Sequence, residues 1–137
     1  MTIIESEVAV GKPIEQVYAF LANMNNHKQL MPPNIYNWES TEDEANFTIQ
    51  NMAKLALKIN QRIENKELTA IPSEKPPFEL ELKWIVSVID DANTRAKLMI
   101  SADLNPMMKM IASGPLQKLV NHQTQKLQEL FNSQFQE

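Results

Sequence analysis

The chain has 137 residues and a mass of 15.7 kDa, which is the usual size of one domain with its own hydrophobic core. Apolar residues make up 43% of it and charged residues 22%, so disordered, collagen-like and membrane-spanning classes are excluded. The 13 Lys and Arg residues against 17 Asp and Glu give a net charge of −4, which argues against nucleic acid and anionic membranes as partners. Because cysteine is absent, disulfides, thiolate metal sites and cysteine nucleophiles are excluded as well.

Neither a targeting signal nor an internal division is predicted. The acidic residues Glu5 and Glu7 come early and no basic segment precedes them, so a secretory signal is not expected. No apolar run approaches the roughly 20 residues needed to span a bilayer, and neither repeats nor a linker divide the sequence. We therefore expect a cytoplasmic protein with one domain over residues 1–137 and without stable membrane insertion.

The first third of the chain predicts a strand followed by two short helices. Apolar and polar residues alternate over residues 2–10, which is typical of a half-buried strand. Pro13 suits the first turn of a helix, and apolar residues recur at helical spacing over residues 14–22. A second short helix is expected over residues 25–31, because the two prolines that follow it cannot continue a helix.

The middle of the chain predicts an antiparallel meander. Apolar residues alternate most strictly over residues 78–88 and also over residues 55–63. Short polar turns, such as residues 90–93, connect these segments, and strands joined by short turns pair antiparallel. The expected strands are Ile35–Ser40, Ala45–Asn51, Leu55–Glu64, Glu67–Ile71, Phe78–Ile89 and Thr94–Asp103.

A long helix is predicted from Pro106 to the end of the chain, where helical spacing returns. Pro115, which follows Gly114, removes one backbone donor and is expected to kink this helix or to split it in two. A helix of about 30 residues spans ~45 Å, so it is the only predicted element long enough to cover the apolar face of the sheet. Its apolar stripe contains Met108, Ile111, Ala112, Leu116, Leu119, Val120, Gln123, Leu127, Leu130 and Phe131.

This order of elements resembles the helix-grip fold of the START/Bet v 1-like superfamily, also called the SRPBCC or polyketide cyclase-like group. The resemblance is carried by residues 7–21, EVAVGKPIEQVYAFL, a strand and a proline-started helix with the pattern P-x-x-x-V-[WY]-x-[FL]-[LI]. Residues 30–38 resemble the segment that usually follows. The resemblance implies an α+β fold in which a curved antiparallel sheet of about six to seven strands wraps around the long C-terminal helix. Two short helices then follow the first strand.

Few residues suggest catalysis. The only glycines are Gly11 and Gly114, so a glycine-rich phosphate loop is excluded. His27 and His122 are far apart and lack the companions of a metal or catalytic motif, so packed or surface histidines are expected. The carboxylates of residues 42–44 fall in a predicted turn, where solvation explains them. We therefore predict no catalytic residues, no metal site and no cofactor.

Polar residues that interrupt apolar strand rows are the best candidates for a binding site. Gln61 interrupts the row of residues 55–63, and Asn51 follows Phe47 and Ile49. A buried amide without a partner costs about 1–3 kcal/mol and needs protein, water or ligand, unless the row simply reaches solvent at a strand end. Ligand pockets combine mostly apolar walls with a few such groups. The predicted ligand-binding residues are Phe47, Ile49, Asn51, Leu57, Ile59, Gln61, Trp84, Met108, Ile111 and Ala112.

The leading hypothesis is a non-enzymatic protein that binds a small hydrophobic or amphipathic molecule between the sheet and the terminal helix. The superfamily resemblance implies two alternatives. One is a cyclase or dehydratase acting on a polyketide-like substrate, with His27 or Glu39 as acid or base, and the other is a co-chaperone-like module that binds protein. The methionines near residues 107–110 suit an adaptable cavity, a partner surface or ordinary core filling. A homodimer through a sheet edge or the terminal helix is compatible with the sequence.

Overall fold

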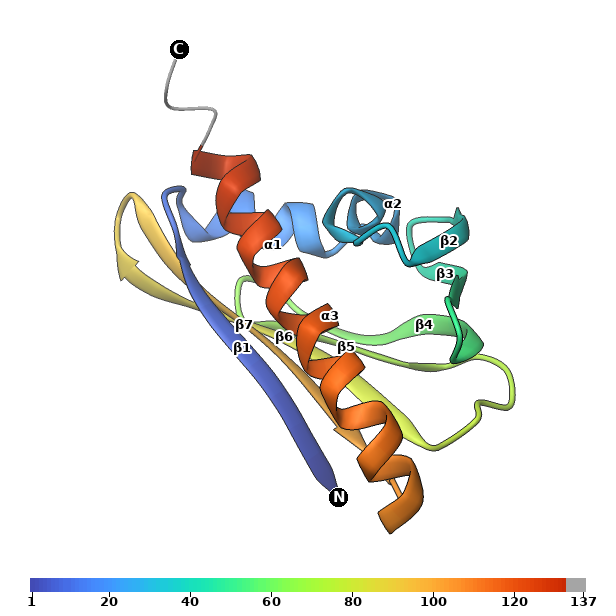
Figure 1. Cartoon of the computed structure of the whole chain (residues 1–137). Coiled ribbons are helices and arrows are strands. Elements are labelled where there is room, and N and C mark those ends of the chain that lie inside the picture. Colours follow the sequence, from blue (N-terminus) through green and yellow to red (C-terminus); the bar gives the residue numbers. More distant parts are fainter. Residues whose placement is uncertain (133–137) are drawn as a thin grey trace.

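A seven-stranded antiparallel sheet and one long helix form most of the protein. The structure is a computed structural model that describes residues 1–132. Figure 1 shows the sheet curling into a half-barrel and α3 crossing one face of it beside β1. The elements are β1 (Thr2–Val10), α1 (Ile14–Leu21), α2 (Met24–His27), the 3₁₀ turn η1 (Lys28–Leu30), β2 (Ile35–Ser40), β3 (Glu44–Ile49), β4 (Ala53–Ile63), β5 (Glu67–Pro72), β6 (Leu80–Asp90), β7 (Asn93–Ala102) and α3 (Pro106–Asn132).

The strand order is β1-β7-β6-β5-β4-β3-β2, and all neighbours pair antiparallel. Strands β2 to β7 therefore form a meander, and β1 joins it at the β7 edge. The two short helices lie between β1 and β2 in the chain. This arrangement confirms the predicted helix-grip architecture, with seven strands in the sheet.

Irregular pairing, rather than glycine, accompanies the bends of the sheet. The register shifts between Tyr36 and Glu39 of β2 and between Ile59 and Gln61 of β4. Asn37 lies within the first of these irregularities and has a φ of 55°, a left-handed conformation that asparagine adopts more readily than most residues. An extra residue in one strand bends it and increases its twist. The sheet thus curls although the chain has only two glycines.

Side chains of α3 cover the free edge of β1. The amide Nε2 of Gln117 donates to the backbone oxygen of Glu5 at 3.0 Å, and Nε2 of Gln128 donates to the backbone oxygen of Ala9 at 2.8 Å. These two glutamines are three helical turns apart, so they lie on the same side of the helix. They occupy carbonyl groups that an exposed edge strand would otherwise offer to another chain.

The hydrophobic core lies between α3 and the concave face of the sheet. The strict alternation predicted for residues 78–88 is confirmed as far as residue 86, with Trp84 and Val86 buried on the face that carries the core, but Val88 is 61% exposed. Most of the predicted helical stripe is buried, but Ile111 is 60% exposed, because the first turns of α3 extend past the sheet. Pro115 does not split the helix, since α3 continues through it from Pro106 to Asn132, and the rest of the predicted helix, residues 133–137, lies outside the described residues.

The Gly114-Pro115 pair explains how the helix continues. A proline ring normally clashes with the Cβ of the preceding residue in a helix, and Gly114 has no Cβ. Pro115 still leaves the carbonyl oxygen of Ile111 without its helical N–H donor. Gly114 is exposed, and a Cβ built there meets no atom within 4 Å outside its chain neighbours and its own helix backbone.

We expect Pro115→Ala to raise the free energy of unfolding by about 1–3 kcal/mol, because it restores one helical hydrogen bond at an exposed position. Gly114→Ala should stabilise the Pro115→Ala background by about 0.5–1 kcal/mol. It should gain less in the wild type, where the new Cβ meets the proline ring. Urea unfolding of the two single variants and the double variant measures this coupling. Equal gains from Gly114→Ala in both backgrounds would contradict the steric explanation.

Candidate functional site

An apolar cavity lies between α3, the concave face of the sheet and the α2–η1 segment. Its volume is about 40 Å³. Trp38 and Phe47 stack face to face on one wall, with ring centroids 5.2 Å apart. All but two of the lining side chains are apolar. They are Met24, His27, Met31, Trp38, Phe47, Ile49, Leu55, Leu57, Phe78, Leu80, Leu82, Ile100, Leu116, Leu119 and Gln123.

His27 is the one ionisable residue in this lining, and its imidazole is held neutral. The side chain is 2% exposed, and its Nε2 donates a hydrogen bond of 2.7 Å to the backbone oxygen of Leu21. Burial lowers the pKa of His27, and the backbone hydrogen bond opposes this shift only partly. A neutral ring that donates from Nε2 leaves Nδ1 unprotonated, so Nδ1 is a hydrogen-bond acceptor.

Gln123 brings an unsatisfied amide to the same cavity. The residue is 2% exposed, and within residues 1–132 its Oε1 has no hydrogen-bond partner. Trp84 lies next to this region and packs edge-on against His27, with ring centroids 6.4 Å apart, and its indole Nε1 is also buried without a partner among the described residues. Burying an unpaired amide costs about 1–3 kcal/mol. The cavity thus combines apolar walls with polar groups that are free to bind.

The predicted site residues are divided between this cavity and an open groove. Phe47, Ile49 and Leu57 line the cavity. The groove has a volume of about 810 Å³ and lies between the N-terminal half of α3, the loop before β2 and the β3–β4 turn. Its lining includes the predicted residues Asn51, Met108, Ile111 and Ala112, and also Ile49. Ile49 and Leu119 line both spaces and therefore separate them.

Three predicted site residues line neither space. Ile59 is half-buried against the core, and Trp84 is buried beside His27. Gln61 is exposed, because the irregularity between Ile59 and Gln61 moves it off the buried row of β4. Asn51 is exposed too, since it lies in the β3–β4 turn with a φ of 62°. Gln61 and Asn51 can therefore bond to water and need no buried partner, and their roles in ligand binding stay predictions.

Two polar residues of the cavity, His27 and Gln123, were not among the predicted ligand-binding residues. Gln123 carried the same signal that singled out Gln61, because it interrupts an apolar row, here the helical stripe of α3. His27 carried no comparable signal, since α2 has only four residues and shows no helical stripe. Ser6 also interrupts an apolar strand row, between Ile4 and Val8, and its Oγ lies 2.7 Å from Oγ1 of the buried Thr124 on α3.

Comparison with solved structures identifies the architecture. Neither protein-family models nor curated protein sequences match the chain. The protein XoxI from Bacillus cereus superposes with a TM-score of 0.78 at 11% sequence identity, covering 98% of this chain and 99% of its own. A START superfamily protein from Mycobacterium smegmatis gives a TM-score of 0.68 at 15% identity, covering 96% and 98% of the two chains. This chain has the START-like helix-grip fold.

A third similar structure is the di-domain ARO/CYC protein BexL from the BE-7585A biosynthetic pathway. The TM-score is 0.70 at 16% identity, and the match covers 94% of this chain and 46% of BexL. At such identities the START-like likeness is one of fold, and a fold hosts many chemistries. Within residues 1–132 no three His, Asp or Glu side chains gather as metal ligands, and no described helix is long and apolar enough to cross a membrane.

The lowered pKa of His27 predicts a loss of stability in mild acid. Below about pH 6.5 the unfolded chain protonates this histidine, whereas the buried ring stays neutral down to its lower pKa. The free energy of unfolding should therefore fall as the pH drops below about 6.5, by at most about 1.4 kcal/mol per pH unit. His27→Gln keeps a donor for the Leu21 carbonyl and should lose this dependence.

Urea unfolding between pH 5 and 7.5 measures the effect. His122→Gln is the matched control, because His122 is only partly buried and does not line the cavity. This variant should keep the acid-dependent loss of the wild type. Parallel pH profiles for the wild type and His27→Gln would contradict the assignment.

Proposed function

We propose that this protein binds a small apolar or amphipathic molecule, without chemical conversion, in the cavity between α3 and the sheet. The observation that supports this most directly is the buried amide oxygen of Gln123, which has no partner within residues 1–132 and lies in a lining that is otherwise apolar except for His27. A side chain chosen only for packing would be leucine here, since an unpaired amide lowers stability. A ligand with one hydroxyl group would donate a hydrogen bond to the amide oxygen of Gln123 or to Nδ1 of His27, or would accept one from the indole N–H of Trp84.

Binding has to enlarge the cavity, because its volume of about 40 Å³ is far below the roughly 300 Å³ of a small-molecule pocket. Met24 and Met31 can supply part of this room, since methionine has three flexible side-chain torsions and fills irregular spaces. Three surface hollows share wall residues with the cavity, among them the groove behind Ile49 and Leu119. Movement of these shared side chains would join the cavity to the surface.

A second candidate function is acid–base catalysis by His27. A neutral imidazole with an unprotonated Nδ1 in an apolar cavity can act as a general base, and one structural neighbour is an ARO/CYC protein of a biosynthetic pathway. The alternative base, Glu39, is exposed and lines a different, open hollow. Turnover of a polyketide-like substrate that is lost in His27→Gln would favour catalysis over simple binding.

We expect Leu116→Trp to reduce uptake of the neutral fluorescent probe N-phenyl-1-naphthylamine at least fivefold. Leu116 projects from α3 into the cavity, so the larger indole occupies the space that the probe requires. Leu116→Met is the control at the same position, because it conserves volume and should bind as the wild type does. Fluorescence titration gives the affinities, and circular dichroism establishes that each variant is folded. Leu57→Phe tests the same point from the opposite wall.

Native mass spectrometry of the purified wild type, followed by organic extraction, provides an independent test. A co-purified molecule that is present in the wild type and absent from folded Leu116→Trp would support the cavity site. Equal probe uptake by the wild type, Leu116→Trp and Leu57→Phe would place binding elsewhere and refute the proposal.

Replacing the unpaired amide should separate stability from binding. Gln123→Leu is expected to raise the free energy of unfolding by about 1 kcal/mol, because it removes a buried unsatisfied group of similar size. The same variant should bind 1-naphthol about threefold to tenfold more weakly and naphthalene as before, since only the hydroxyl of naphthol can pair with the amide. Thermal or urea unfolding and probe displacement measure the two effects.

Gln128→Leu is the matched control on the same helix. Its amide already donates to the backbone oxygen of Ala9, so this replacement loses a hydrogen bond. It should give no gain in stability and no change in the preference for naphthol. If Gln123→Leu destabilises the protein as Gln128→Leu does, the amide of Gln123 has a partner and the argument for a polar ligand group fails.

A further inference from the structure

We infer that the ligand is an anionic amphiphile, whose apolar part occupies the cavity and whose negative headgroup lies in the groove beside Lys118 and His122. This inference rests on the proposed function and adds the chemical class of the ligand. Its basis is the distribution of charge around the cavity, which differs sharply between the interior and the surface, and between one side of the cavity and the other.

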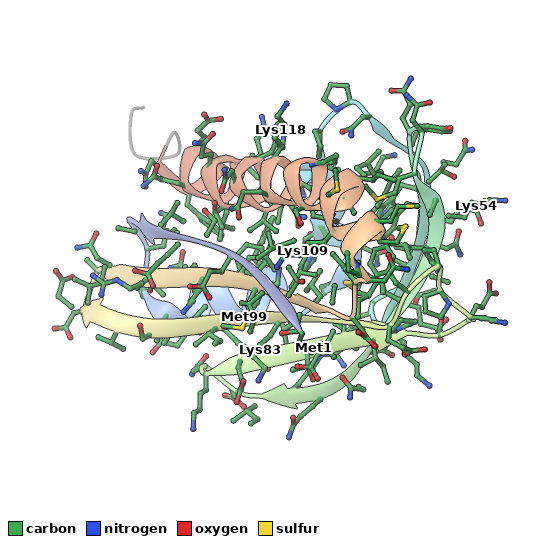
Figure 2. All side chains as sticks on the ribbon, turned by 60° about the horizontal axis from the view of Figure 1, so that its bottom comes forward. Met1, Lys54, Lys83, Met99, Lys109 and Lys118 are labelled. Carbon is green, nitrogen blue, oxygen red and sulfur yellow. The ribbon has the colours of Figure 1, made fainter. Side chains whose placement is uncertain are left out.

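The groove adjoins the cavity directly. Ile49 of β3 and Leu119 of α3 belong to both linings, so displacement of these two side chains connects the two spaces. Lys118 and His122 are the neighbours of Leu119 on the groove side of α3. Figure 2 shows Lys118 on the side of α3 that faces away from the sheet, so its ammonium group is available at the surface.

The charged side chains on this side are all basic. Lys118 and His122 line the groove, and the adjoining hollow of about 690 Å³, which shares Pro32 and His122 with it, adds Lys28 and Lys126. Neither lining contains an Asp or Glu, although the protein as a whole has a net charge of −4. Among the described residues, none of these three lysines forms a salt bridge. An anion placed here would gain several unopposed positive charges.

A third hollow, which also adjoins the cavity, provides the contrast. It shares Trp38, Phe47 and Leu55 with the cavity and has a volume of about 480 Å³. Its charged side chains are mixed, because Lys54 and Lys75 lie with Glu39 and Glu74. Only the side near α3 has the uniform charge that favours an anionic headgroup, so charge complementarity distinguishes the two routes.

The charged group of the ligand has to lie outside the cavity, because the cavity lining offers no counter-ion. The cavity lining contains no carboxylate, lysine or arginine, and its single histidine is neutral. A carboxylate taken into such surroundings would lose its hydration without gaining a counter-ion. The amide of Gln123 can pair only with a neutral polar group on the buried part. The combination selects a molecule with a hydrated anion at one end and an apolar body.

The test compares three ligands with a ten-carbon chain, in which the tenth carbon of decanoate is the carboxylate carbon: decanoate, 1-decanol and decyltrimethylammonium. Their dissociation constants are measured by displacement of N-phenyl-1-naphthylamine at pH 7.5, below the concentrations at which they form micelles. We expect decanoate to bind at least fivefold more tightly than decanol, and the cation to bind most weakly. Added salt should weaken only the binding of decanoate, because it screens exposed charges.

The deciding variant is the triple replacement Lys28→Gln, Lys118→Gln and Lys126→Gln. It should weaken decanoate binding about tenfold, since one exposed ion pair changes a dissociation constant by roughly twofold to fivefold. Decanol binding should stay unchanged. The matched control replaces Lys54, Lys58 and Lys75 by Gln, which alters the net charge equally. Lys54 and Lys75 line the third hollow and Lys58 lies on β4 outside both basic linings, so this control should change decanoate binding less than twofold.

Each outcome decides one of the two proposals. If decanol binds and decanoate binds no better, or if the two triple variants weaken decanoate equally, the anionic-headgroup inference is overturned while the cavity proposal stands. If none of the three ligands displaces the probe, and the probe itself is not taken up, the cavity proposal fails and the inference fails with it.

Discussion

Burial of the concave apolar face of the sheet against α3 is the interaction on which the rest of the structure depends. No other described element is long enough to cover that face, and each fully buried Leu or Phe side chain contributes about 1.5–3 kcal/mol. Polar contacts then fix where the helix lies. Ser6 pairs with Thr124, and Gln117 and Gln128 bind carbonyl groups along the edge of β1. The helix is therefore held at β1, and the wider space toward β3 and β4 is left for the cavity.

The residues that disturb this packing are the ones that suggest a function. His27 and Gln123 are polar, buried and next to the same cavity, and neither is required to cover the sheet. A buried imidazole and an unpaired amide both lower stability, in acid or at all pH values respectively. Proteins retain such groups where function needs them, because most destabilising features without a function are replaceable by leucine or valine at little cost. Apolar burial stabilises the fold, and the candidate functional groups are the two polar side chains that are buried within it.

The structural neighbours show how loosely this scaffold depends on particular residues. Chains at 11% and 15% identity share the fold over nearly their whole length. What they share is the alternation of strands, the two short helices and a terminal helix that covers the sheet. Under the proposed binding function, specificity comes from the few lining residues that interrupt the apolar pattern and from the charge on the surface beside the cavity. In this chain those features are a neutral interior and a basic surface around Lys118.

The sequence by itself determined the elements and their order, because periods of two and 3.6 residues depend on which face of a strand or helix is buried. It therefore predicted the rows of apolar residues on β6 and α3. It also correctly placed Phe47, Ile49 and Leu57 on the face of the sheet that lines the cavity. It could not predict the irregular pairing that exposes Gln61, since an extra residue in one strand reverses the facing of those that follow. Nor could it bring His27 and Gln123 together, because they are 96 positions apart and meet only when α2 and α3 pack against the same sheet. Only the tertiary structure placed both residues at one cavity, since which distant residues line the same space is set by how the elements pack and not by any local pattern.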